Sequence, residues 1–193
     1  MGQLIVRKLI VDERNELFDA QGMRKIVLPS DYSRIRDYSS EVLKDCPEVF
    51  REGNLLEQQL SEIIKNGIKH GNRCDPSKRL TIWYDFRKRV RFIVEDEGEG
   101  FTNLEAWNDF YRKRQEALHA QDFDSFLSLA SYRGPRSDET DGGNSLIAAL
   151  EYWNGGMIYN NARNKVGVVR WYSGGAEVSV AAARSSAGGF SES

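Results

Sequence analysis

Two short stretches of the chain decide its fold, EIIKNGIKHGN at residues 62–72 and DEGEGF at residues 96–101. The first spaces a carboxylate, an amide and an imidazole four residues apart, which aligns them along one side of an α-helix. The second has an acidic residue and two glycines after a strand, a composition typical of a turn where backbone comes close to a flat ligand. Together they predict a nucleotide pocket. Its candidate residues are Glu62, Asn66, His70, Asp96, Gly98 and Gly100.

The helix that carries the first stretch is expected to begin near Asn54 and to end at Gly71. Asn54, with Glu57 three residues later, resembles a capping box, and a glycine is a common C-terminal stop. Gly67 in the helix interior costs about 0.8–1 kcal/mol relative to Ala, which indicates close packing or a close ligand approach. The apolar stripe lies largely on the side opposite the pocket residues and consists of Leu56, Leu60, Ile63 and Ile64.

Further strands and helices follow from periodicity and turn signals on both sides of these stretches. Ser30 is the expected N-cap of a helix with apolar positions between residues 35 and 43. Gly142 and Gly143 are expected to open a third main helix that continues to Trp153. Two more helices are expected over residues 104–111 and 123–130, and strands over residues 4–11, 23–28, 80–86, 90–95, 157–159 and 166–172. This order predicts an α/β two-layer sandwich with a mixed sheet and helices on one face.

The composition of the 193 residues is that of one domain with a substantial core, over residues 1–172, followed by a tail at 173–193 that is expected to be disordered. The formal net charge of −2 gives no global field for nucleic acid or anionic membranes, and the basic residues 87–91 are interpreted as a solvated hairpin tip. No apolar run approaches membrane length. Cys46 and Cys74 form no CxxC, so neither a zinc site nor a disulfide framework is implied, and a cytoplasmic location fits.

The pattern Glu-x3-Asn-x3-His-Gly-Asn, then Asp-x-Gly-x-Gly, then a glycine-rich helix start, resembles the N, G1 and G2 boxes of the GHKL (Bergerat) ATP-binding fold of histidine kinases, gyrase and MutL. Within that superfamily, LPSD at residues 28–31 and KHGN at residues 69–72 are most similar to the bacterial anti-sigma-factor serine kinases. The resemblance covers residues 23–172. It implies a mixed, mainly antiparallel sheet with helices on one face, and a long ATP lid at about residues 102–141.

The resemblance also implies a role for each position. Asp96 would accept a hydrogen bond from the adenine amino group, Asn66 would offer its amide oxygen to Mg²⁺, and Glu62 would be the general base for a serine hydroxyl or a water. His70 belongs to the first box, although a histidine near a helix C-terminus can simply interact with the helix dipole. The other implied nucleotide-binding positions are Gly98 and Gly100 at the pocket edge, Gly142 and Gly143 at the phosphates, and Arg133 and Arg136 as γ-phosphate contacts in a closed lid.

The function that the resemblance implies is that of an ATP- and Mg²⁺-dependent protein serine kinase. Such a kinase sequesters a sigma factor, phosphorylates a STAS-type anti-anti-sigma antagonist and forms a homodimer, without direct contact to nucleic acid or membrane. Asp141 stands where the first glycine of the G2 box is expected, and the lid segment is long. These departures favour an alternative, a non-catalytic, nucleotide-gated protein-binding module. A histidine kinase domain acting in trans is less supported, because no phosphoacceptor helix pair is present.

Overall fold

The computed structural model describes residues 7–132 and 144–172. They form a mixed α/β fold built on one six-stranded sheet in the order β1-β5-β6-β4-β3-β2. Short β1 runs parallel to β5, and every other neighbouring pair is antiparallel. The predicted mixed, mainly antiparallel sheet is therefore confirmed. The strands are β1 (Ile10–Val11), β2 (Arg24–Pro29), β3 (Arg79–Asp85), β4 (Val90–Asp96), β5 (Gly156–Tyr159) and β6 (Lys165–Arg170).

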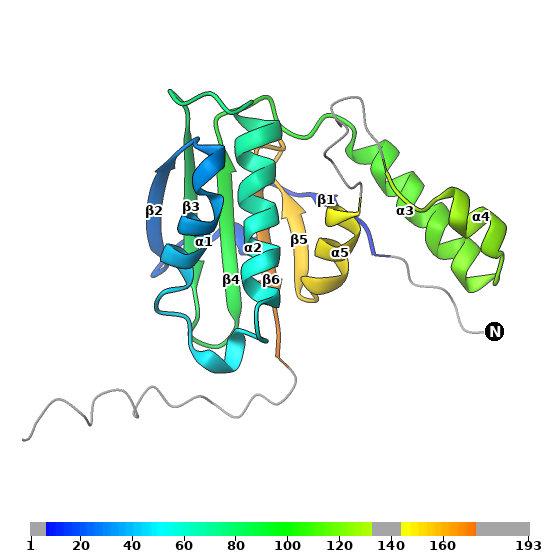
Figure 1. Cartoon of the computed structure of the whole chain (residues 1–193), viewed down its shortest axis with the longest axis horizontal. Coiled ribbons are helices and arrows are strands. Elements are labelled where there is room, and N and C mark those ends of the chain that lie inside the picture. Colours follow the sequence, from blue (N-terminus) through cyan, green and yellow to red (C-terminus); the bar gives the residue numbers. More distant parts are fainter. Residues whose placement is uncertain (1–6, 133–143, 173–193) are drawn as a thin grey trace, which may run out of the picture.

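Five α-helices lie in the described residues, and three of them cover one face of the sheet (Figure 1). The covering helices are α1 (Ile35–Leu43), α2 (Leu55–Asn66) and α5 (Ser145–Tyr152). The other two, α3 (Leu104–His119) and α4 (Phe123–Ser128), project away from the sheet as a two-helix arm (Figure 1). Each helix of the described ranges is too short or too polar to cross a lipid bilayer.

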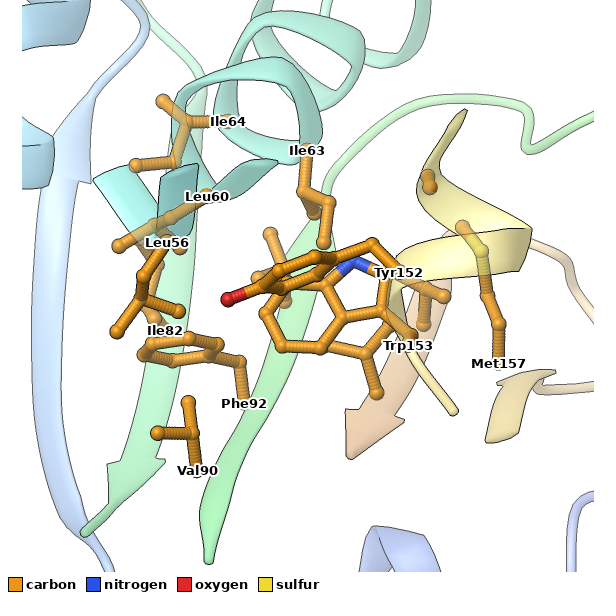
Figure 2. Packing of buried hydrophobic residues seen from close by; sticks show 14 of the residues in the cluster. Leu56, Leu60, Ile63, Ile64, Ile82, Val90, Phe92, Tyr152, Trp153 and Met157 are labelled. Carbon is orange, nitrogen blue, oxygen red and sulfur yellow. The ribbon is translucent and has the colours of Figure 1, made fainter. Parts of the chain in front are cut away.

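The main core lies between the sheet and the covering helices (Figure 2). The predicted stripe of α2 is its centre, since all four apolar residues are buried. They pack with alternate residues of β3 and β4, such as Ile82 and Phe92, and with Trp153 at the end of α5. The Trp153 indole meets the Phe92 ring edge-on, with centroids 5.8 Å apart. Each fully buried side chain of this size contributes about 1.5–3 kcal/mol, so this layer fixes the position of α2 on the sheet.

A smaller apolar cluster lies on the opposite face of the sheet. Ile158 and Val169 alternate along their strands with residues of the main core, so the pleat directs them to the other side. There they pack against Leu17 and Phe18 of a short 3₁₀ turn, η1 (Glu16–Phe18). The second face is therefore partly covered by a turn, whereas α1, α2 and α5 all lie on one face, as predicted.

Two predicted helix caps are wrong. Asp31, not Ser30, caps the segment before α1, because its carboxylate accepts the backbone N–H of Ser33 at 3.0 Å. The side chain of Ser30 is buried instead. Asn54 does precede α2, but it makes no side-chain capping bond, and Glu57 accepts a hydrogen bond from the Ser40 hydroxyl at 3.3 Å. Packing between α1 and α2 therefore replaces the local capping box.

The remaining boundaries agree with the sequence prediction within two residues, with three exceptions. The first predicted strand shrinks to the two residues of β1, and residues 1–6 lie outside the described part. The predicted start of the third main helix, at Gly142 and Gly143, also lies outside it, and α5 begins at Ser145. Finally, α3 is longer than expected and reaches His119. Its base is held by Asn108, whose amide accepts from Leu9 N at 2.8 Å and donates to Leu9 O at 2.9 Å.

Candidate functional site

A cavity of about 370 Å³ lies among α2, the ends of β4 and β5, and the base of α3. Five of the predicted site residues line it, namely Glu62, Asn66, His70, Asp96 and Gly100. Gly98 is not among the lining residues, but its N–H donates to Asp96 Oδ1 at 2.8 Å. Four further predicted positions, Arg133, Arg136, Gly142 and Gly143, lie outside the described residues, as does Asp141.

The helix that carries the first motif ends differently from the prediction. The α-helical part stops at Asn66, and Gly67–Gly71 forms a π-helical turn in which Asn72 N donates to Gly67 O at 2.8 Å. Gly71 is the last helical residue, as expected. A Cβ at Gly67 would lie 2.5 Å from Leu80 Cδ1, so this turn packs directly on β3. The close packing inferred for Gly67 is confirmed, and the wider turn still brings His70 to the cavity.

Asp96 is a partly buried acidic residue in the wall of the cavity. Its carboxyl group fills the space that a side chain at Gly71 would need, since a Cβ there would lie 2.3 Å from Asp96 Cγ. Burial raises the pKa of Asp96 to about 6, and the Gly98 N–H, which donates to Oδ1 at 2.8 Å, opposes that rise. In the described part of the chain no group donates a hydrogen bond to Oδ2. A ligand with an N–H donor would satisfy this oxygen.

The loop after β4 is held against the end of α2 by a buried amide. Asn72 is fully buried, its Oδ1 accepts from Glu97 N at 2.8 Å, and its Nδ2 donates to Arg79 O at 2.9 Å. The sequence motif included Asn72 without giving it a role. The structure shows that Asn72 joins the two motifs, and it thereby fixes the position of the loop that follows Asp96.

Replacing Asn72 by alanine is expected to destabilise the protein by about 1–3 kcal/mol, because two part-buried hydrogen bonds, each worth about 0.5–1.5 kcal/mol, would be lost. The midpoint of urea unfolding measures this loss. Asn161→Ala, in an exposed turn, is the control and should change the midpoint little. An equal loss in the two variants would contradict the role given to Asn72.

Aromatic and polar side chains that sequence reasoning missed form the other side of the cavity. Phe101 and Tyr159 face each other with ring centroids 5.9 Å apart. Phe101 N donates to Arg163 O at 3.0 Å, and Gly100 has a φ of +79° that a residue with a side chain rarely adopts. The missed lining residues include Lys65, Phe101, Trp107, Tyr132, Tyr159 and Arg163. The alternation of β5 could have indicated Tyr159, but nothing local marks the others.

Glu62 and Asn66 lie one helical turn apart on the cavity side of α2. Lys65 Nζ donates to Glu62 Oε2 at 3.4 Å, and both side chains are partly buried. The Asn66 amide has no hydrogen-bond partner within residues 7–132 and 144–172. A carboxylate and a partnerless amide oxygen are hard ligands of the kind that Mg²⁺ accepts, and Mg²⁺ takes its other ligands from phosphates and water. The residues present therefore fit this ion.

No known protein-family model matches the chain, and no curated protein matches it in sequence. The interpretation of the cavity rests on its own residues and on the motifs that they form.

Proposed function

We propose that this chain is an ATP- and Mg²⁺-dependent protein serine kinase with the GHKL type of nucleotide site. One observation carries the proposal: Asp96 presents a carboxylate oxygen without a donor in a cavity that Glu62 and Asn66 line from one helix. The order of these groups, from Asp96 through Asn66 to Glu62, is that expected for the base, the phosphates and the acceptor of a bound nucleotide.

The groups around Asp96 favour adenine as the base. A carboxylate accepts a hydrogen bond from the exocyclic amino group of adenine and cannot pair with the carbonyl of guanine. Phe101 and Tyr159 offer flat apolar surface beside it. A cavity of about 370 Å³ is also within the usual range for small-molecule sites, about 300–1,000 Å³.

The groups farther along α2 provide the chemistry of phosphoryl transfer. Glu62 is the general base that orients a serine hydroxyl for attack on the γ-phosphate, and Lys65 holds its carboxylate through the contact at Oε2. Asn66, with phosphate oxygens and water, holds Mg²⁺, which neutralises charge on the phosphates when bound. The acceptor is a serine of a STAS-type antagonist, and the second partner is a sigma factor. This part of the proposal, with the homodimer and the cytoplasmic location, rests on the resemblance of the motifs.

Glu62→Gln tests the catalytic part of the proposal. It is expected to lower the rate of phosphoryl transfer by about 10²–10⁴-fold while ATP affinity changes little, because the amide keeps the size of the side chain. Transfer of labelled γ-phosphate to candidate STAS proteins measures the rate, and calorimetric titration measures affinity. Glu57→Gln, which changes the other carboxylate of α2, is the matched control. Equal phosphorylation by wild type and Glu62→Gln would refute the catalytic role.

A second candidate, a nucleotide-gated binding module without phosphoryl transfer, is favoured by the arm. Phe123 and Leu127 of α4 are 63% and 67% exposed, whereas Trp107 at the base of α3 lines the cavity. The arm therefore connects an exposed apolar surface to the nucleotide site. Partner binding that requires ATP, persists in Glu62→Gln and yields no phosphoprotein would favour this candidate.

A further inference from the structure

A group of basic side chains lies at the end of β4 opposite to Asp96. Arg91 belongs to this group and lies five positions before Asp96 along β4, or about 17 Å away. Arg91 pairs with Asp85 on one neighbouring strand and with Val169 on the other. Since Val169 packs with Leu17, Arg91 lies on the sheet face away from α2. The site is thus separate from the nucleotide cavity.

Arg91 is buried and forms no ion pair within the described residues. The sequence interpretation of residues 87–91 as a solvated tip is wrong for this residue, which is only 7% exposed. Its Nε is sealed from solvent without a partner, and the described residues form no hydrogen bond with its guanidinium group. Burial of a cation that lacks hydrogen-bond acceptors costs free energy. A ligand that supplies such acceptors to Arg91 would remove this cost.

The two nearest carboxylates are already engaged. Asp85 accepts from Arg87 Nε at 2.8 Å and from Arg87 Nη2 at 3.0 Å, a bidentate pair. Asp19 accepts from the backbone N–H of Gln21 at 2.9 Å. Neither carboxylate forms an ion pair with Arg91 among the described contacts. Burial, and next the charge of Arg89, lower the pKa of Arg91, whereas Asp85 and Asp19 oppose this change.

The neighbouring cations are held in position. The Arg89 guanidinium lies over the Trp171 indole, 4.6 Å from its centroid. The Arg87 guanidinium lies on the turn at Gly22, where an added Cβ would be 3.5 Å from Nη1. Contacts of this kind orient the planar groups before any ligand arrives, which reduces the entropic cost of binding.

We infer that Arg87, Arg89 and Arg91 form a binding site for a phosphate group on the sheet face opposite the helices. Arginine forks match the geometry of phosphate oxygens, and a doubly charged phosphate would supply the acceptors that Arg91 lacks. The group can come from inorganic phosphate or from a phosphorylated serine. This inference does not depend on the proposed kinase activity.

Titration of the full chain with inorganic phosphate at constant ionic strength tests the inference, with the arginine Nε–H resonances followed by NMR. We expect the Arg91 resonance to shift and saturate in wild type, also when ADP fills the nucleotide cavity. Phosphate should raise the midpoint of thermal unfolding in wild type but not in Arg91→Met. Arg36→Gln, which removes one exposed charge from α1, should respond as wild type does.

Three results would each overturn the inference: no shift of the Arg91 resonance, an equal response in Arg91→Met, or a response abolished by ADP. A phosphoserine peptide that binds at least about tenfold tighter than phosphate would identify a phosphoprotein as the source, whereas equal affinities would identify the free ion. Circular dichroism of Arg91→Met shows whether the variant is folded. If it is not, Arg91→Lys, which keeps the charge without the fork, takes its place and should bind phosphate more weakly than wild type.

Discussion

Asp96→Asn is expected to weaken ATP binding strongly and, at the same time, to make the unliganded protein more stable than wild type above pH 6. An amide offers Oδ1 to Gly98 N–H as before, but it places an N–H₂ group where the adenine amino group needs an acceptor. The hydrogen bond from the adenine amino group to the carboxylate would be lost, and two N–H donors would face each other. This change should weaken binding by about 100-fold or more. Calorimetric titration with ATP measures this loss.

The sign of the stability change follows from the pKa of Asp96. Burial raises it from 3.8 to about 6, so the fold favours the protonated carboxyl. The stability that this group contributes is complete below pH 3.8 and is lost as the pH rises through 6. At pH 8 the free energy of unfolding of Asp96→Asn should therefore exceed that of wild type by about 1–3 kcal/mol. This difference should shrink as the pH is lowered, because the Asp96 carboxyl of wild type becomes protonated. Thermal unfolding at pH 4, 6 and 8 measures the difference.

Asp85→Asn is the matched control, because it makes the same atomic change in a carboxylate at the other end of the sheet. Although burial acts to raise the pKa of Asp85, the hydrogen bonds from Arg87 hold it below 3.8. This variant should lose stability at neutral pH and bind ATP as wild type does. If Asp96→Asn binds ATP normally, Asp96 does not contact the base and the assignment of the cavity is wrong.

Gly98→Ala is expected to cause a large loss of stability. A Cβ at Gly98 would lie 2.0 Å from the backbone oxygen of Gly71, and Gly71 is held in turn by the carboxyl group of Asp96. Backbone at this place cannot move without opening the contact between α2 and β4. We expect a loss of about 3 kcal/mol or more, a decrease of about 6–12 °C in the thermal midpoint, and loss of ATP binding.

Gly53→Ala separates this clash from ordinary backbone strain. A Cβ at Gly53 meets no atom within 4 Å, but its φ of +65° is costly for alanine, at about 1–2 kcal/mol. The variant should be moderately destabilised and should bind ATP normally. Similar midpoints for the two variants would show that the loop after β4 adapts, contrary to the close contact between Gly98 and Gly71.

Local patterns predicted those parts of the site that depend on one element. Glu62, Asn66 and Asp96 could be placed together because helical spacing selects one side of α2 and the end of β4 follows from its alternation. The mixed sheet and its covering helices followed in the same way. What periodicity could not supply were contacts between distant segments, such as Asn72 with Glu97 and Arg79.

Two further misses have physical causes of the same kind. Ser30 and Asp31 are both good N-caps in isolation, and the choice between them is made by tertiary structure, since Ser30 N donates to Lys78 O and its side chain is buried. A basic run is usually solvated, but Arg91 is buried on the sheet face on which η1 packs. In each case a neighbour from another part of the chain decides the outcome.

The pairing of the first strand with the fifth has a consequence for the order of folding. Ile10 pairs with Ile158, and Leu9 is joined to Asn108, so the N-terminal segment finds its place only after most of the chain is available. Contacts this distant in sequence form late, because closure of long loops is entropically costly. The hairpin of β3 and β4 with α2 can assemble early. The side of the cavity built from β5 and the base of α3 is then completed after the side that α2 and β4 form.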